Sequence, residues 1–146
     1  MTTKSDSQLA LGTYVKLIRA AESATGRIHR HLAGSRITTS QFGVLEALLH
    51  LGPLCQKDLA EKILKSSGNL TLVIDNLERQ GLVTRKRSPE DRRFVTITLT
   101  KKGLWLIAEL FPLHEQAVAR EFSVLTGAEQ EELGRLCRKL GKQEPD

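Results

Sequence analysis

What the sequence lacks limits the classes of protein to which it can belong. In 146 residues no apolar run approaches the length that is needed to cross a bilayer. The only two cysteines, Cys55 and Cys137, form no C-x-x-C pair, so the sequence indicates neither a zinc module nor a disulfide framework. The polar N-terminal segment has no apolar middle of the kind found in secretory signals. We therefore expect a cytoplasmic protein that does not associate with membranes.

Catalytic signatures are missing as well. The chain contains no H-E-x-x-H, no glycine-rich phosphate loop and no G-x-S-x-G. His29 and His31 stand two residues apart on a predicted helix, where their side chains diverge and make a poor chelate. We therefore expect no enzymatic activity, no metal site and no cofactor. A nucleic-acid-binding protein and a helical protein-interaction adaptor stay open at this point.

Positive charge is concentrated in the middle of the chain. The formal net charge is +5, and residues 36–102 hold 12 lysines and arginines against 7 acidic residues, so the two ends together are neutral. A basic middle between neutral or acidic ends is typical of a module that contacts nucleic acid. Duplex binding that weakens steeply with salt would separate such a module from an adaptor.

Hydrophobic periodicity and cap residues predict six helices and a hairpin. The helices are expected over residues 7–33, from Thr38 to Gly52, over 55–64, over 66–80, from Lys101 onward with a kink or break at Pro112, and after Thr126. Residues 82–87 and 93–100 alternate as strands. Two short helices followed by a hairpin form a winged helix-turn-helix.

We therefore predict a mainly α (α+β) fold. A single domain, residues 1–146, would contain a winged helix-turn-helix module at 36–103 with a two-stranded wing. Helical regions at 7–33 and 104–140 would flank this module. Their apolar faces exceed what one small core needs.

The predicted helix over 66–80 is the candidate reading helix. Its apolar face, formed by Leu70, Val73, Ile74 and Leu77, should be buried. Small or polar groups dominate the opposite face near the N-terminus, where they could approach bases or phosphates: Ser66, Ser67, Gly68, Asn69, Thr71 and Leu72. Asparagine pairs best with adenine and leucine can contact a thymine methyl group, which favours an A/T-rich target.

The segment "RKRSPEDRRF", residues 85–94, carries five cations in a hairpin tip. Arg87, Arg92 and Arg93 would lie next to the DNA backbone or in a narrow minor groove, whose negative potential attracts arginine. Asp91 could hold one neighbouring arginine in position. The alternative is a solvated turn, but the neighbouring helix and the central charge favour DNA contact.

From Leu54 to Gly103 the sequence resembles the MarR family of bacterial transcription regulators. The resemblance rests on the leucine-alanine turn at Leu59-Ala60, on "IDNLERQGLV", and on "DRR" followed by an alternating strand and "LTKKG". The helical ends extend it to nearly the whole chain.

The resemblance implies a homodimer built from the first and last two helices, in which each subunit has one winged module that binds a pseudo-palindromic operator. It implies that residues 66–72 open the recognition helix. It also implies that Arg92 or Arg93 enters the minor groove, with Asp91 as its structural partner. The chain departs from the family pattern because it has no Arg or Lys between Lys65 and Arg79, which argues against arginine-to-guanine readout.

The resemblance also implies regulation, because family members often respond to phenolic or other apolar compounds or to thiol oxidation. We expect a homodimeric repressor that a small aromatic effector releases. The predicted effector pocket is an apolar cleft between the paired helices and the winged module, lined by Tyr14, Ile18, Phe42, Leu45 and Phe111. Alternatively, Cys55 at a helix N-cap is a candidate redox sensor, whereas Cys137 is expected in the core.

Overall fold

The structure is a computed structural model that describes residue 3, residues 5–63 and residues 67–146. The chain divides into two compact units. We call residues 1–30 with 115–146 the helical unit, and residues 31–114 the winged unit. Among the described helices, none combines the length and the apolar character that crossing a membrane requires.

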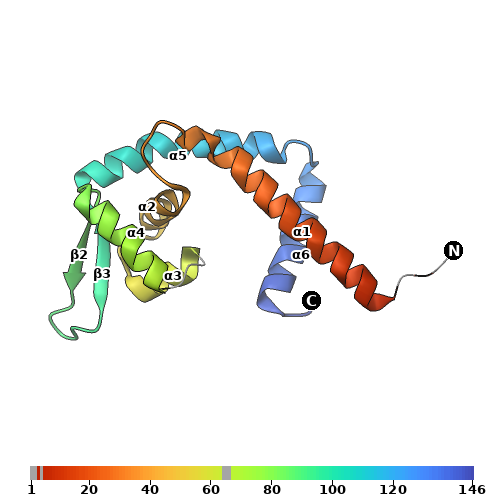
Figure 1. Ribbon diagram of the computed structural model, residues 1–146, viewed down its shortest axis with the longest axis horizontal. Coiled ribbons are helices and arrows are strands. Elements are labelled where there is room, and N and C mark those ends of the chain that lie inside the picture. Colours follow the sequence, from red (N-terminus) through yellow and green to blue (C-terminus); the bar gives the residue numbers. More distant parts are fainter. Residues whose placement is uncertain (1–2, 4, 64–66) are drawn as a thin grey trace. The chain divides into compact units, whose positions relative to one another are not determined.

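The helical unit contains α1 (Asp6–Ile28), the second part of α5 (Lys101–Phe122) and α6 (Gly127–Lys142). The winged unit contains the first part of α5 and the α-helices and strands that lie between α1 and α5 in the chain (Figure 1). These are α2 (Thr39–Leu51), β1 (Leu54–Cys55), α3 (Gln56–Ile63), α4 (Ser67–Arg79), β2 (Val83–Arg87) and β3 (Val95–Leu99). A 3-10 turn, η1 (His29–Leu32), follows α1.

Local signals start α2 and α6 where the sequence predicts, whereas the first helix, predicted over 7–33, ends at Ile28 and is followed by η1. The Thr38 hydroxyl accepts from the Gln41 backbone N–H at 3.1 Å, and the Gln41 side chain accepts from the Thr38 N–H at 3.0 Å. Thr126 and Glu129 form the same reciprocal capping box ahead of α6. Gly81 follows α4 with a φ of 75°, which residues with a side chain rarely adopt. The helix starts predicted at Thr38 and after Thr126 are confirmed.

The sheet has three antiparallel strands in the order β1-β3-β2, where the sequence predicts only two. The prediction missed β1, in which Leu54 pairs with Ile97 and Cys55 pairs with Thr96. The strand has only two residues, and Cys55 was expected to open the next helix, which instead begins at Gln56. Two residues show no alternation, so only their partners in β3 define them as a strand.

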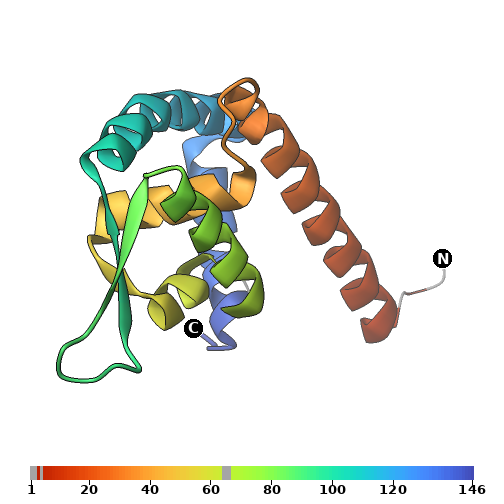
Figure 2. The same ribbon diagram turned by 60° about the vertical axis from the view of Figure 1, so that its left-hand side comes forward.

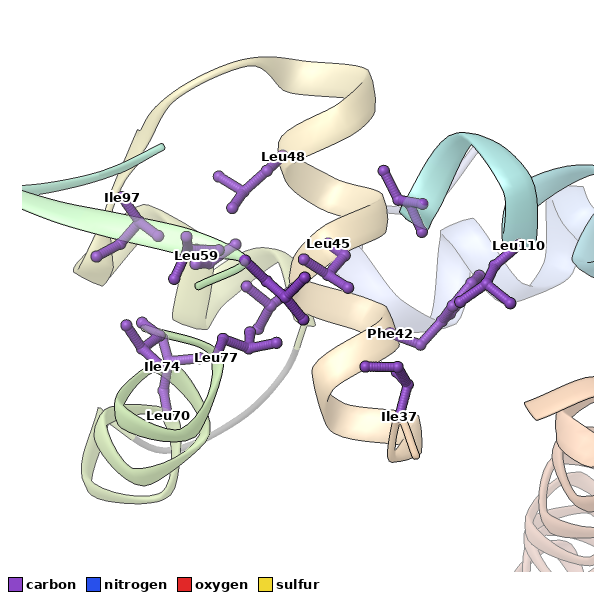
Figure 3. Close-up of a cluster of buried hydrophobic side chains, with 14 of the residues drawn as sticks. Ile37, Phe42, Leu45, Leu48, Leu59, Leu70, Ile74, Leu77, Ile97 and Leu110 are labelled. Atoms are coloured by element: carbon purple, nitrogen blue, oxygen red, sulfur yellow. The ribbon is translucent and has the colours of Figure 1, made fainter. Parts of the chain in front are cut away.

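The core of the winged unit lies between α2, α4 and the sheet (Figure 3). Leu70, Ile74 and Leu77 of α4 are fully buried and Val73 is half-buried against the same core, which confirms the predicted inner face. They face Leu45 of α2, and Ile97 supplies the inner face of β3. Burial of each such side chain contributes about 1.5–3 kcal/mol, so this contact fixes which face of α4 remains in solvent.

A close backbone contact joins the end of the hairpin to α5. The Thr100 hydroxyl caps α5 by accepting from the Gly103 N–H at 3.0 Å, and it donates to the Gly81 carbonyl at 2.6 Å. A Cβ on Gly103 would lie 2.0 Å from the Leu82 carbonyl oxygen. Only glycine therefore fits at this position.

Of the kink or break predicted at Pro112, the break does not occur, because α5 is one helix from Lys101 to Phe122, and the kink stays a prediction. Proline removes one N–H donor and crowds the preceding turn. Contacts on both sides of Pro112 offset this cost. Ile107 and Leu110 are buried in the core of the winged unit, and Glu121 pairs with Arg27 in the helical unit.

Candidate nucleic-acid interface

The outer face of α4 presents a short row of side chains to solvent. Asn69, Thr71 and Leu72 are exposed, and Leu72 retains 62% of its accessible surface. Ser67 and Gly68 open the helix, whereas Ser66 lies outside the described residues. The row therefore combines an amide, a hydroxyl and an apolar side chain on a helix whose inner face is fixed in the core.

Two side chains from other elements hold the start of α4. Gln56, the first residue of α3, donates from Nε2 to the Thr71 hydroxyl at 2.8 Å. Arg85 of β2 donates from Nη2 to the Thr71 carbonyl at 3.1 Å. Sequence reasoning missed both residues, because they lie 15 and 14 positions from Thr71 and no local pattern connects them.

The hairpin that joins β2 to β3 extends beyond the helices of the winged unit (Figure 2). Its turn is built on Ser88, whose hydroxyl accepts from the N–H groups of Glu90 and Asp91 at 3.3 Å each. The Ser88 N–H donates to the Phe94 carbonyl at 2.9 Å, and the Phe94 N–H donates to the Asp91 carbonyl at 3.0 Å. The cationic tip therefore has a defined backbone.

Asp91 holds Arg93 in a bidentate ion pair. The Arg93 Nε lies 3.0 Å from Asp91 Oδ1, and Nη2 lies 2.8 Å from Oδ2. The pKa of Asp91 lies below its ordinary value. The largest cause is the hydrogen bonding from the Arg93 side chain, and the hydrogen bond from the Arg93 backbone N–H is the second. The same pairing raises the pKa of Arg93. The Arg93 side chain nevertheless stays 88% exposed, so its direction is fixed while its outer edge faces solvent.

The other two arginines of the tip have different environments. Arg87 donates from Nη1 to the Arg92 carbonyl at 3.0 Å, which ties the two sides of the turn together. The Arg92 side chain is exposed and has neither a hydrogen bond nor an ion pair with any residue that the structure describes. The sequence left open which arginine Asp91 holds, and the geometry identifies Arg93.

The residues of the predicted effector pocket are divided between the two units. Tyr14 and Ile18 belong to α1 in the helical unit and are 62% and 38% exposed. Phe42, Leu45 and Phe111 belong to the winged unit, where Leu45 is fully buried. The pocket that would join the two sets stays a prediction.

Two of the predicted pocket residues, Phe42 and Phe111, belong to an aromatic cluster in the winged unit. The cluster also contains His31 and His114. The His114 ring lies 4.7 Å from the Phe42 ring and 6.2 Å from the Phe111 ring, centre to centre. His31 Nε2 and His114 Nδ1 are 3.2 Å apart, within hydrogen-bond distance. Glu46 approaches His114 Nε2 at 4.0 Å. The sequence did not predict these contacts, because His31 and His114 lie 83 positions apart.

The two cysteines lie in different surroundings. Cys55 is half-buried and lines a hollow of about 340 Å³ with Lys57, Arg93 and Phe94. Its redox role stays a prediction. Cys137 was expected in the core, and this prediction is wrong, because its side chain is exposed on α6. Its apolar neighbours on the same helix, Leu133, Leu136 and Leu140, are exposed as well, so helical periodicity identified an apolar face and not a buried one.

The winged unit combines two features: a helix whose inner face is buried and whose outer face is exposed, and a hairpin that carries arginines. Together these features define a winged helix-turn-helix DNA-binding protein. The model of the MarR family matches residues 37–95. The chain is 34% identical over 135 residues to the HTH-type transcriptional regulator MhqR of Bacillus subtilis (strain 168), across 92% of this chain and 93% of that protein. The chain therefore belongs to the MarR family and is a DNA-binding transcription regulator.

Solved structures share the fold over most of the chain. One is BpsR of Bordetella bronchiseptica, whose DNA binding is regulated by 6-hydroxynicotinic acid. It has a TM-score of 0.82 at 29% identity and covers 89% of this chain and 98% of its own. Another is NadR in complex with 4-hydroxyphenylacetate, with a TM-score of 0.78 at 28% identity over 99% of this chain and 100% of its own. The predicted family and the winged helix-turn-helix fold are thereby confirmed.

Proposed function

We propose that the protein is a cytoplasmic, homodimeric repressor that binds a pseudo-palindromic, A/T-rich operator and is released by a small aromatic acid or phenol. The winged module, residues 36–103, binds DNA, and the helices at 7–33 and 104–140 form the dimer. The observation that carries this proposal is the exposed row of Asn69, Thr71 and Leu72 on α4, with Arg92 and Arg93 exposed on the hairpin of the same unit.

The two sets of side chains read DNA differently. Residues 66–72 enter the major groove, where Asn69 pairs with adenine and Leu72 contacts a thymine methyl group. Because α4 presents no cation there, the arginines of the hairpin supply most of the attraction to phosphate. Arg93, oriented by Asp91, enters the minor groove, and Arg92 contacts the backbone. Arg87 supports the turn from within.

Exposed apolar side chains of the helical unit support a dimer. Leu9, Leu11, Tyr14 and Val15 of α1 keep 42–65% of their accessible surface, as do Leu136 and Leu140 of α6 at 47% and 54%. Residues of α1, α5 and α6 also line an apolar groove of about 350 Å³. A second copy would cover these faces, and a two-fold dimer would present two α4 helices to half-sites about 10 bp apart or a multiple of this spacing.

The effector proposal is supported by the aromatic cluster and by the relatives. Phe42 and Phe111 flank His114, and aromatic side chains favour stacked or edge-to-face contacts with an aromatic ligand. BpsR responds to 6-hydroxynicotinic acid and NadR binds 4-hydroxyphenylacetate, which are both hydroxylated aromatic acids. Hydroxylated aromatic acids and phenols should raise the melting temperature and weaken operator binding. If a panel of such compounds changes neither quantity, a repressor without an effector is preferred.

Recovery of bound DNA tests the central proposal. Genomic fragments are captured with the purified protein and sequenced, and the enriched sequence is then titrated against a scrambled duplex at several salt concentrations. We expect an A/T-rich inverted repeat that is bound at least about a thousandfold more tightly than the scrambled duplex. Equal affinity for the two duplexes would contradict a sequence-specific repressor.

A further inference from the structure

We infer that Arg85 positions the recognition helix relative to the wing, and that it contributes about tenfold to the preference for operator over other DNA without contacting DNA itself. This inference deepens the proposed function and rests on it, since it requires α4 to read bases. Arg85 belongs to the arginine-rich stretch of the hairpin, but its contacts differ from those of the arginines at the tip.

Arg85 connects β2 to two full turns of α4. Its Nη1 lies 2.5 Å from Asp75 Oδ1 and 3.4 Å from Glu78 Oε1. Its Nη2 donates to the Thr71 carbonyl at 3.1 Å, and its backbone N–H donates to Glu78 Oε2 at 3.1 Å. Residues 71, 75 and 78 follow helical spacing, so one guanidinium contacts a single stripe along the helix.

The sheet register explains why Arg85 faces α4 while its neighbour does not. Arg85 pairs with Ile97, which is fully buried on the inner face of β3, so the two side chains lie on the same side of the sheet. The Arg85 side chain is only 23% exposed. Lys86 pairs with Thr96, points to the opposite face and is exposed. Of two adjacent cations, only Arg85 reaches the helix.

The contacts leave Arg85 little capacity to bind phosphate. Both of its terminal nitrogens bond to α4, and two carboxylates lie within 3.4 Å. The planar guanidinium has a fixed fork of donors, so it holds the carboxylates and the carbonyl in one geometry. Gln56 bonds to the side chain of Thr71, and Arg85 bonds to its carbonyl. These two contacts fix the rotation of α4 about its own axis, and with it the direction of Asn69 and Leu72.

The chemistry predicts a loss of specificity when this contact is removed. Without Arg85, α4 still packs through Leu70, Ile74 and Leu77, but its rotation against the hairpin is less defined. Contacts to base edges depend on such orientation, whereas phosphate attraction depends on charge. Removal of Arg85 alone would also leave Asp75 and Glu78 without their cation, which would weaken all DNA binding through repulsion.

A charge-balanced double variant separates these effects. Arg85→Gln with Asp75→Asn removes one charge of each sign, so the net charge stays at its wild-type value. We expect affinity for the scrambled duplex and the salt slope to stay unchanged, and the preference for the operator to fall about tenfold, comparable to the loss of one base contact. The matched control is Lys86→Gln with Glu90→Gln, which makes the same charge change on the hairpin and should keep the wild-type preference.

Arg85→Lys provides a second measurement in case the double variant does not fold. An ammonium group can pair with one carboxylate but cannot span Asp75 and the Thr71 carbonyl together, so the preference should be intermediate. A wild-type preference in a folded Arg85→Lys or double variant overturns the inference. An equal loss on both duplexes with a lower salt slope also overturns it, because Arg85 would then be a phosphate contact. If the wild-type protein itself shows no preference, the proposed function fails instead.

Discussion

At the scale of single residues, the arginines of one short hairpin have distinct environments. Arg87 bonds to a carbonyl of the turn, Arg93 is held by Asp91, and Arg85 is held by α4. The Arg92 side chain has no such bond to any described residue. Because a bound guanidinium is oriented and an unbound one is adaptable, substitutions of these residues should have different effects on DNA binding.

Arg92→Ala and Asn69→Ala should separate attraction from reading. Arg92→Ala should weaken binding to every duplex and lower the salt slope by about one unit. Asn69→Ala should cost about 1–3 kcal/mol on the operator and spare random DNA. Titrations of both variants on operator and scrambled duplex at several salt concentrations measure the two quantities. An unchanged affinity and slope for Arg92→Ala would identify its side chain as a solvated surface group.

The sign of the Asp91→Asn effect tests the orientation of Arg93. Removal of an acidic group near DNA should strengthen binding if Asp91 only neutralises Arg93. If Asp91 directs Arg93 into the groove, the variant should instead bind about two- to fivefold more weakly, because the arginine then loses its fixed direction. Fluorescence titration at one salt concentration gives the sign, and Glu90→Gln, which removes a neighbouring acid of the same tip, is the matched control.

The same pair has a defined pH dependence. The folded pKa of Asp91 lies below its ordinary value of 3.8, so the stability that the pair contributes is present above pH 3.8 and is lost as the pH falls through the lowered value. The Arg93 Nε–H resonance should therefore keep its paired position down to pH 3.8 and shift with Asp91 titration only below that pH. A titration midpoint at or above pH 3.8 for the Asp91 carboxyl in an NMR titration would show that Asp91 does not hold Arg93 in solution.

At the scale of elements, one backbone contact joins the recognition helix, the hairpin and α5. Gly81 ends α4, Thr100 bonds to its carbonyl, and Gly103 packs against the Leu82 carbonyl. Thr100 caps α5 within the same contact. The position of the hairpin therefore depends on glycine at both ends of the contact.

Gly103→Ala should destabilise the protein by about 1–3 kcal/mol or more, because the added Cβ would lie 2.0 Å from a backbone oxygen that cannot move away easily. Gly141→Ala is the matched control. It also replaces a helical glycine, but its Cβ meets nothing within 4 Å, so it should be neutral or stabilise by up to about 1 kcal/mol. Urea unfolding at one protomer concentration measures both variants. Equal stabilities would contradict the close contact.

At the scale of the whole molecule, the helical unit exposes large apolar side chains on α1 and α6, although the winged unit has a closed core. Soluble monomers rarely expose large contiguous apolar patches. A family member that recognises a pseudo-palindrome also needs two winged units. Both arguments lead to the proposed dimer, whose folding would be inseparable from its assembly.

Light scattering at micromolar concentration should give twice the chain mass of 16.2 kDa. Leu136→Glu places a charge on the exposed apolar face of α6 and should yield monomer or unfolded protein. Leu51→Glu is the control, since Leu51 is similarly exposed at 53% but belongs to α2 in the winged unit. A monodisperse wild-type monomer would overturn the dimer.

The sequence by itself determined the features that depend on residues three or four positions apart. The helix starts at Thr38 and Thr126 and the buried face of α4 were predicted, because their partners lie within one helical turn. The resemblance of the winged segment to the MarR family was equally legible, since it rests on residues in one continuous stretch.

The tertiary structure alone decided what depends on distant partners. Leu54 becomes a strand residue only because Ile97 lies beside it, and Arg85 positions α4 only because β2 packs against that helix. Asp91 has an arginine on each of the next two positions, and the turn on Ser88 determines that it binds Arg93. Periodicity placed Cys137 on an apolar face, but exposure depends on which surfaces the rest of the chain covers.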